Sequence, residues 1–438
     1  MAMINAFAGE TTDLSPSDRA LIARREAALG PAYRLFYERP VHFVRGRGTW
    51  LFDQDGVAYL DAYNNVASVG HCHPRVVEAL ARQAAALNTH TRYLNEAVVA
   101  YAERLLAKFP RDLGHVMFTC TGSEANDLAI RIAKSFTGRR GIIVTELAYH
   151  GGTEAVARIS PSLGSFVDLG ADTRTVPAPD GFHVPGKELG AYFAAGVRAA
   201  IADLERHGAP PAALIVDTIF SSDGVFADPA GFLREAVDAI HQAGGLFIAD
   251  EVQAGFARTG EAMWGFQRHG VAPDLVSLGK SMGAGHPIAA LVTRPEVVEE
   301  FGRRSRYFNT FGGNPVSCAV GDAVIDVLES EGLQDSAREV GLLFRQELRR
   351  LAASHPIIAD VRGAGLFIAV EIVSDDPAHP SSDLAGVIVN QLRERQVLIS
   401  ATGPRANVLK IRPPLVFSRD DAGVFMERLE AVLKALPT

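Results

Sequence analysis

Two polar side chains follow apolar segments at positions that could do chemistry. Lys280 follows the apolar run at 274–278 after one glycine, Gly279, and has small residues beside it in the sequence. Asp250 follows the apolar run at 245–249. Both runs are typical of strands that are buried on both faces, and ligands of open α/β sheets bind at the carboxyl ends of such strands. We therefore expect an amine and a carboxylate at neighbouring strand ends.

A third motif predicts an anion site. Residues 116–127 are typical of a strand, a tight turn and a helix that begins near Gly122 and Ser123. The start of a helix binds phosphate through unpaired N–H groups and the positive end of the helix dipole. A capping box with Ser123 or Thr121 as N-cap is the structural alternative, and both can hold because they use the same end of the helix. An amine, a carboxylate and a phosphate site are together what a pyridoxal phosphate enzyme requires, since the lysine forms the Schiff base and the acid keeps the pyridine nitrogen protonated.

Each of these features alone has an ordinary explanation. A lysine after a strand is usually a solvated loop residue, and the neighbouring pair Asp250 and Glu251 could hold a divalent metal or cap a helix. The combination of the three features favours the cofactor site.

Five motifs in this order resemble the class III aminotransferases, which are fold-type I pyridoxal phosphate enzymes. They are Thr-Gly-Ser-Glu-Ala-Asn-Asp at 121–127, Ala-Tyr-His-Gly at 148–151, Ile-Ala-Asp-Glu-Val-Gln at 248–253, Leu-Gly-Lys at 278–280 and Asn-Thr-Phe-Gly-Gly-Asn-Pro at 309–315. The similarity runs from about Tyr37 to the C-terminus. It implies pyridoxal 5'-phosphate as cofactor and an α/β fold of type I, with a large, mostly parallel sheet domain and a discontinuous small α+β domain.

The resemblance also implies roles around the cofactor ring. Lys280 would form the Schiff base and then act as general base, and Asp250 would pair with the pyridinium nitrogen. Tyr149 would stack on one ring face as a third catalytic residue, with His150 beside it. Val252 would pack against the opposite face.

Four further residues match family positions around the phosphate and the ring oxygen. Gly122 and Ser123 would bind the phosphate, and Gln253 would donate a hydrogen bond toward the 3-oxygen of the ring. Thr310 matches a threonine that reaches the phosphate of the neighbouring subunit. The resemblance therefore implies a homodimer with shared active sites.

Three residues are candidates for substrate recognition. Arg412 matches an arginine that binds a substrate carboxylate through a bidentate fork. Many family members pair this arginine with a glutamate, and at the segment we match to that glutamate this sequence has Asp217, which is one methylene shorter. Arg92 could meet a substrate phosphate or carboxylate, or cap a helix at the surface.

The resemblance leaves two main reactions open, and behind them a racemase, aminomutase or decarboxylase of the same fold. We expect first a transaminase that moves an amino group from a primary amine or ω-amino acid to a 2-oxo acid. The segments 88–94 and 307–321 are similar to the alanine–glyoxylate aminotransferase 2-like branch, which includes phospho-lyases that release phosphate and ammonia from substrates such as phosphoethanolamine. Both reactions begin with removal of the same proton from Cα, so the motifs do not separate them. A non-enzymatic binding protein that retained the fold is a third reading, against which the joint presence of Lys280, Asp250 and Ser123 argues.

The amino-acid composition of the chain argues against some classes of binding partner. The 438 residues are 47% hydrophobic, with a formal net charge of -8. The negative charge argues against nucleic acid or an anionic membrane as a partner. No apolar run is long enough for a membrane helix and no signal peptide is visible, so we expect a cytoplasmic enzyme. We expect no metal site, and we interpret Cys72, Cys120 and Cys318 as small buried hydrophobic residues.

The pattern along the chain predicts its organisation. Alternation at 44–62 predicts a hairpin, and apolar runs at 116–120, 142–145, 213–217, 245–249, 274–278 and 288–292 predict strands of the main sheet. Helical periodicity begins at Pro74 and again after Pro315, where it continues to Ser354, and strands are expected around 360–371 and 408–412. Residues 160–190 are expected to form a long surface loop. We divide the chain into 1–73 and 316–438, which form the small domain, and 74–315, the large cofactor-binding domain.

Overall fold

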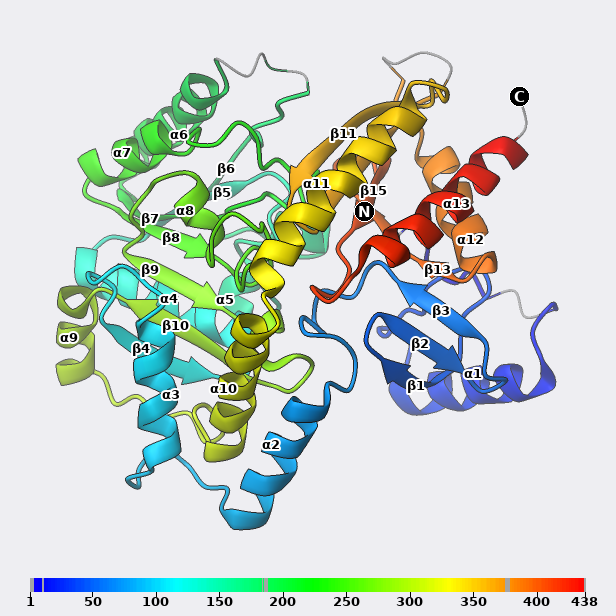
Figure 1. Ribbon diagram of the computed structural model, residues 1–438. Helices are drawn as coiled ribbons and strands as arrows, with labels where there is room; N and C mark the ends of the chain where they lie inside the picture. Colours follow the sequence, from blue (N-terminus) through cyan, green and yellow to red (C-terminus); the bar gives the residue numbers. More distant parts are fainter. Residues whose placement is uncertain (1–3, 10–11, 183, 185–187, 375–378, 437–438) are drawn as a thin grey trace.

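The large domain is built on a seven-stranded sheet. The computed structural model describes residues 4–9, 12–182, 184, 188–374 and 379–436 (Figure 1). Every neighbouring pair in the sheet is parallel except those of β10, which is antiparallel to both β4 and β9. The strand order is β4 (His115–Thr119), β10 (Ala289–Thr293), β9 (Leu275–Leu278), β8 (Leu246–Asp250), β7 (Pro211–Asp217), β5 (Gly141–Thr145) and β6 (Thr173–Val176).

Both faces of this sheet are buried, which explains the continuous apolar runs. In β8, Leu246 and Ile248 belong to one apolar cluster, whereas Phe247 and Ala249 belong to another. Helices α4 (Gly122–Thr137) and α9 (Pro295–Arg304) form the first cluster with one face of the sheet. Helices α6 (Leu189–Arg206) and α7 (Arg234–Gln242) pack on the other face. The polar residues that end these strands therefore emerge together at one edge.

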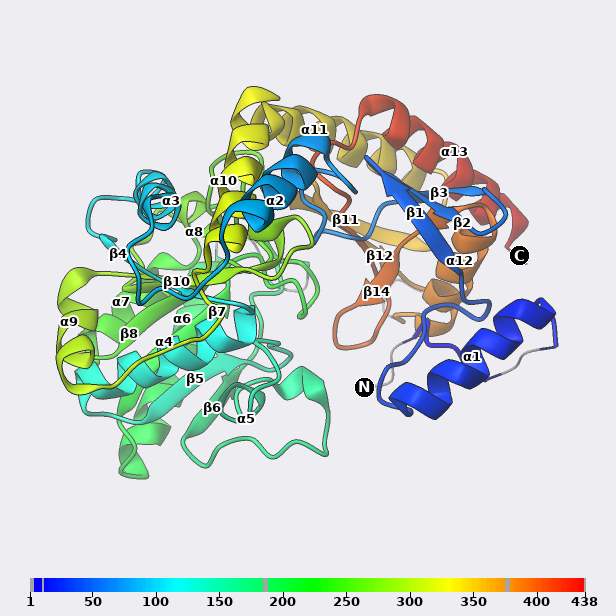
Figure 2. The same ribbon diagram turned by 90° about the horizontal axis from the view of Figure 1, so that it is seen from below.

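Two smaller sheets lie beside the large one (Figure 2). The first contains β1 (Phe43–Arg47), β2 (Trp50–Asp53), β3 (Ala58–Asp61) and β13 (Val397–Leu398), and the second contains β11 (Ile358–Ala364), β12 (Phe367–Ile372), β15 (Val408–Ile411) and β14 (Ser400–Thr402). Strand β13 pairs in parallel with β3, so the N-terminal and C-terminal segments share one sheet. The predicted fold class is confirmed.

The remaining helices connect and cover these sheets. Helix α10 (Pro315–Ser330) packs against α2 (Pro74–Ala86) and α3 (Glu96–Leu106), and α11 (Leu333–Ala352) lies against β11 and α13 (Arg419–Ala435). The others are α1 (Pro16–Leu29), α5 (Glu154–Ala157), α8 (Gly265–Arg268), α12 (Ser382–Glu394) and the short 3₁₀ turns η1 (Pro161–Leu163) and η3 (Lys280–Gly283). The predicted boundary after residue 315 falls at the start of α10, and the domain division stays a prediction.

Two expectations need correction. The predicted loop at 160–190 contains the edge strand β6, which is short and pairs only with β5, so its pattern was too weak to stand out among the Pro and Gly residues. Cys72 is exposed, whereas Cys318 is buried and Cys120 lies between these extremes. Cys72 lies in the turn before α2, where its positive φ directs the chain at the surface. The hairpin within 44–62 is confirmed by β2 and β3.

Within the described residues, no helix has the length and apolar character needed to span a bilayer.

Candidate active site

Five segments of the large sheet meet at one cavity. Its volume is about 120 Å³, and it lies where β4, β5, β7, β8 and β9 end. Its lining includes most of the residues predicted from the sequence: Gly122, Ser123, Tyr149, His150, Gly151, Asp217, Asp250, Val252, Gln253 and Lys280. A second cavity of about 400 Å³ is lined by Lys280 and by Arg412. Lys280 therefore faces both cavities.

Lys280 is held in an unusual backbone conformation. It begins the turn η3 directly after β9, and its φ of +33° lies in a region that a residue with a side chain rarely adopts. The pKa of Lys280 is lowered to about 8, mainly because the amine is buried and further because Arg412 lies nearby, whereas Asp250 and Asp217 act in the opposite direction. This amine therefore loses its proton more readily than an ordinary lysine and is more often neutral and nucleophilic near neutral pH.

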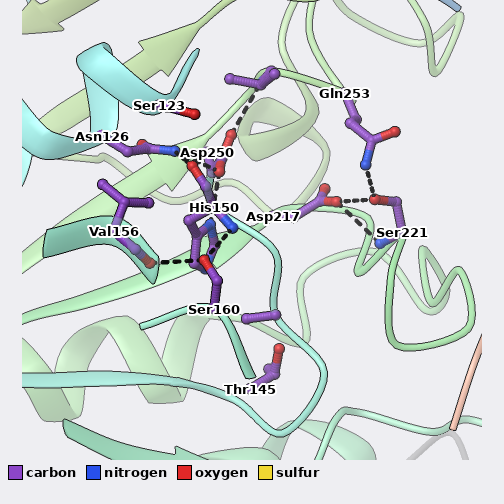
Figure 3. A network of polar contacts seen from close by, with 12 residues as sticks. Ser123, Asn126, Thr145, His150, Val156, Ser160, Asp217, Ser221, Asp250 and Gln253 are labelled. Atoms are coloured by element: carbon purple, nitrogen blue, oxygen red, sulfur yellow. Dashed lines mark hydrogen bonds and ion pairs between the residues drawn. The ribbon is translucent and has the colours of Figure 1, made fainter. Parts of the chain in front are cut away.

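Asp250 is surrounded by hydrogen-bond donors (Figure 3). Its Oδ2 accepts from Asn126 Nδ2 at 2.9 Å and from His150 Nδ1 at 2.7 Å, and its Oδ1 accepts from the backbone N–H of Val252 at 3.1 Å. Asn126 Nδ2 also donates to the backbone carbonyl oxygen of His150. The backbone N–H of His150 donates to Ser160 Oγ. Three donors thus fix the orientation of the Asp250 carboxylate.

The adjacent carboxylate has a different task. Glu251 accepts from Thr218 Oγ1 at 2.8 Å and from the N–H groups of Gly265 and Phe266 at the start of α8, and burial raises its pKa to about 7. Asp250 and Glu251 are therefore committed to separate networks. Among the described residues no group of three His, Cys, Asp or Glu side chains could hold a metal ion.

The start of α4 presents free donors to the cavity. Thr121, not Ser123, is the N-cap, because its Oγ1 accepts from Glu124 N at 3.2 Å while Glu124 Oε2 accepts from Thr121 N at 3.0 Å. This leaves the hydroxyl of Ser123 at the cavity, where it accepts from Gly152 N at 3.1 Å. Only glycine fits at 151, since its φ is +139° and a Cβ there would lie 2.3 Å from Ser123 Oγ.

The other cofactor residues predicted from the sequence lie around this point. Tyr149 is 44% exposed and His150 is buried beside it. Val252 packs so closely on the turn that a Cβ at Gly122 would lie 2.9 Å from Val252 Cγ2. Both Tyr149 and Val252 line the cavity from segments that follow different strands.

Arg412 and Asp217 do not form an ion pair like the arginine–glutamate pair expected from the family resemblance. Arg412 Nη1 donates to Asn65 Oδ1 at 2.9 Å and to Gln253 Oε1, and its guanidinium lies 4.3 Å from the centre of the Tyr63 ring. Asp217 instead accepts from the hydroxyl and the N–H of Ser221.

Gln253 joins these two groups. Its Nε2 donates to Ser221 Oγ, and the Ser221 hydroxyl donates to Asp217 (Figure 3). Its Oε1 accepts from Arg412, so the Gln253 side chain bridges the arginine and the serine. The predicted contact of Gln253 with a ring oxygen stays a prediction. Burial and the nearby Asp250 raise the pKa of Asp217.

Neither Arg92 nor Thr310 lines the two cavities that Lys280 faces. Both are exposed, and Arg92 stacks on Phe308 with its guanidinium carbon 3.8 Å from the ring centre. The cavity beside Arg92 has a volume of about 450 Å³ and is lined by Phe308 and Asn309 but not by Lys280. The roles predicted for Arg92 and Thr310 stay predictions.

The sequence reasoning missed three polar residues of the site: Asn65, Asn126 and Ser221. Asn126 carried a signal, because it is a polar side chain on the buried face of the amphipathic helix α4. Asn65 and Ser221 lie in irregular segments whose sequences contain no comparable pattern.

Comparison with known proteins identifies the family. Residues 36–433 match the model of the family described as Aminotransferase class-III. The chain belongs to the class III aminotransferases. It is 40% identical to "Alanine--glyoxylate aminotransferase 2-like" of Drosophila melanogaster, over 98% of this chain and 91% of that protein. It is 34% identical to "Ethanolamine-phosphate phospho-lyase homolog 1" of Caenorhabditis elegans, over 95% of this chain and 94% of the relative.

Solved structures of related proteins support this family assignment. A phospholyase from Arthrobacter, solved in complex with phosphoethanolamine, superposes with a TM-score of 0.93 at 44% identity, covering 95% of this chain and all of that one (100%). An amine transaminase from an uncultivated Pseudomonas species, solved with the cofactor bound, superposes with a TM-score of 0.82 at 28% identity, covering 90% and 94% of the two chains. The protein is thus a pyridoxal 5'-phosphate-dependent enzyme of fold type I.

The cavity fits this cofactor. The molecule has a phosphate, an aromatic ring with a basic nitrogen, and an aldehyde. The cavity contains a helix N-terminus with the Ser123 hydroxyl, the aromatic ring of Tyr149, the hydrogen-bonded carboxylate of Asp250 and the amine of Lys280. Each group of the cofactor has a chemically matched partner.

Proposed function

We propose that this class III enzyme is a phospho-lyase, which releases phosphate and ammonia from a small amine that carries phosphate on the carbon next to the amine-bearing carbon. Phosphoethanolamine is the simplest such compound. The observation that carries the proposal is the similarity to the Arthrobacter phospholyase over nearly the whole chain. Arg412 supports it, because this cation lines the same cavity as Lys280.

In this proposal the chain's own residues bind the cofactor, orient the reacting groups and move a proton. Pyridoxal phosphate, when bound, supplies the electron sink that stabilises negative charge at Cα of the amine. Gly122 and Ser123 hold its phosphate, and Asp250 keeps the ring nitrogen protonated. His150 and Asn126 hold Asp250 in place.

Lys280 then removes the proton from Cα of the substrate. The lowered pKa of its amine, about 8, leaves part of it free as a base at neutral pH. The phosphate departs from Cβ with the electron pair of the Cβ–O bond, and a carbon–carbon double bond forms between Cα and Cβ. Arg412 compensates the charge of the departing phosphate with the planar donor geometry that suits this group. Water then hydrolyses the C–N bond of the remaining unsaturated amine, which gives ammonia and an aldehyde.

Transamination, the reaction that the sequence alone placed first, is the second candidate. It is supported by the aminotransferase name of the Drosophila relative. The same proton abstraction by Lys280 would begin this reaction, and a 2-oxo acid would then accept the amino group.

One experiment separates the two reactions. The holoenzyme is incubated with phosphoethanolamine alone, and separately with a panel of amines and ω-amino acids together with a 2-oxo acid, while phosphate, ammonia and new amino acid are each assayed. Equal amounts of phosphate and ammonia without any oxo acid would support the phospho-lyase. A new amino acid formed without phosphate release would establish the transaminase in its place. Lys280→Ala protein is the control for non-enzymatic hydrolysis.

We also propose a homodimer in which Thr310 reaches the partner's cofactor phosphate, since Thr310 is exposed in its own chain. The cytoplasmic location stays a prediction, and two relatives carry mitochondrial names.

A further inference from the structure

Arg412 is a cation without an anionic partner. Its Nη1 binds two neutral amide oxygens, those of Asn65 and Gln253, and its Nε is buried without any hydrogen-bond partner. Within the described residues no carboxylate forms an ion pair with it. Arg362, in the neighbouring part of the same small sheet, differs, because it lies 2.8 Å from Asp360 and 2.7 Å from Glu371. The charge of Arg362 is neutralised and the charge of Arg412 is not.

Two carboxylates in this part of the molecule, Asp61 and Asp217, have other hydrogen-bond partners. Asp61 lines the same cavity, but its Oδ2 lies 2.6 Å from His71 Nε2 and its Oδ1 accepts from two backbone N–H groups. Asp217 accepts from Ser221 and from the Ile219 N–H. The positive charge of Arg412 therefore stays available to a molecule in the cavity.

Asn65 fixes the arginine without neutralising it. The side chain is buried, and its Nδ2 donates to Gln253 Oε1 at 3.4 Å, which directs its Oδ1 to Arg412. An aspartate at this position would have nearly the same shape and would form an ion pair with Arg412. The side-chain amide of asparagine in place of a carboxylate at position 65 thus decides whether the charge of Arg412 is left unneutralised.

We propose that Asn65 is a specificity-determining residue, which selects amines that carry an anionic group and disfavours uncharged amines. The cavity of about 400 Å³ is lined by Lys280 and Arg412, so an amine can meet the first while its phosphate or carboxylate meets the second. An amine without an anionic group would form no charge-assisted contact with Arg412, so it would bind less tightly. This inference deepens the proposed function and rests on it for the assignment of Lys280 and Arg412 to one substrate.

The test is Asn65→Asp, with Asn64→Asp as matched control. Asn64 lines the same cavity and makes no hydrogen bond to Arg412, so the control adds an equal charge without the contact. The probe is 2-aminoethylphosphonate, a phosphonate that resembles phosphoethanolamine, and binding is followed through the cofactor's absorbance. We expect Asn65→Asp to weaken binding about tenfold or more, since a charge-assisted contact is lost. Asn64→Asp should weaken it clearly less.

A third variant separates charge from orientation. Asn65→Ala removes the amide and leaves Arg412 unneutralised, so its affinity for the phosphonate should stay closer to the wild-type value than that of Asn65→Asp. Thermal melting of each holoenzyme checks that the variants fold. Wild-type affinity in Asn65→Asp would overturn the proposal. Equal losses in Asn65→Asp and Asn64→Asp would overturn it too, because the contact would then not matter.

The same measurements distinguish this inference from the proposed function. Binding of β-alanine is compared with that of propylamine, which lacks the anionic group. If phosphoethanolamine releases no phosphate but β-alanine binds more tightly than propylamine, and Asn65→Asp abolishes the difference, the phospho-lyase proposal fails and the role of Asn65 stands. If phosphate is released and Asn65→Asp changes nothing, the phospho-lyase proposal stands and the role of Asn65 fails.

Discussion

The two ends of the active site are assembled in different ways. At the cofactor end, Asp250 and Lys280 come at the ends of adjacent parallel strands of one sheet, β8 and β9. At the substrate end, Arg412 contacts Asn65 across 347 residues of sequence, and the two come from different small sheets and their connections. The first end depends on strand order within a single sheet, whereas the second depends on how terminal segments pack together.

The two ends also differ in how charge is balanced. Asp250 is a buried carboxylate that accepts hydrogen bonds from three donors of the protein itself. Within the described residues, Arg412 donates only to neutral amide oxygens. A cofactor that stays bound suits a permanently organised site, while a substrate that comes and goes can supply the missing charge itself. Substitutions at each end can test this difference.

The largest effect is expected at Lys280. Lys280→Ala should abolish turnover, because no other amine lines the cofactor cavity within the described residues. Borohydride treatment of the wild-type holoenzyme should fix the cofactor on Lys280, as peptide mapping by mass spectrometry would detect. Cofactor fixed on a different lysine would contradict the assignment. A melting curve of the variant checks that its fold is retained.

The pair of adjacent carboxylates offers a sharper comparison. Asp250→Asn should reduce kcat by roughly 10²–10³-fold, the usual scale for losing one preorganised electrostatic contact, with less effect on cofactor affinity. Glu251→Gln should lower the melting temperature, because Glu251 caps α8, and leave kcat per folded molecule nearly unchanged. Similar kcat losses in both variants would remove the distinction between a chemical and a structural carboxylate.

A smaller and selective effect is expected at Arg412. Arg412→Gln should weaken the binding of amines that carry an anionic group much more than the binding of simple amines. The reason is the loss of a charge-assisted contact of about 1.5–3 kcal/mol. It should also raise the pKa of Lys280 above about 8, because Arg412 is one of the groups that lower it. The rate at which the apoenzyme captures cofactor rises with pH through this pKa, so its midpoint should move to higher pH. An unchanged midpoint would show that the two ends of the site are not electrostatically coupled.

An effect of similar free energy, on cofactor retention instead of substrate binding, is expected at the proposed subunit boundary. Thr310→Ala should weaken cofactor retention by about 1.5–3 kcal/mol, one hydrogen bond to a charged group, measured by dialysis of the holoenzyme. Mixing Thr310→Ala and Lys280→Ala chains should restore one intact site per mixed dimer. Activity no greater than the sum of the two parent variants, in a preparation in which sedimentation shows mixed dimers, would argue against shared sites.

Much of the fold could be predicted from the sequence, because strands buried on both faces must be apolar throughout. The six predicted strands of the large sheet correspond to β4, β5, β7, β8, β9 and β10. The edge strand β6 escaped prediction, since an edge strand needs only one partner and tolerates polar residues. Its neighbours in sequence are rich in turn residues, which hid the short strand Thr173–Val176.

The sequence by itself determined the residues at the cofactor end. Asp250, Lys280 and the start of α4 each come at the end of an apolar strand, and the carboxyl ends of parallel strands meet at one edge of the sheet. Only the tertiary structure decided the partners of these groups. Asn126 holds Asp250 from another element, and Asn65 in place of a carboxylate leaves Arg412 uncompensated. The physical reason is that local patterns specify elements and the residues that end them, whereas a hydrogen bond between distant segments depends on a packing geometry that neither segment encodes alone.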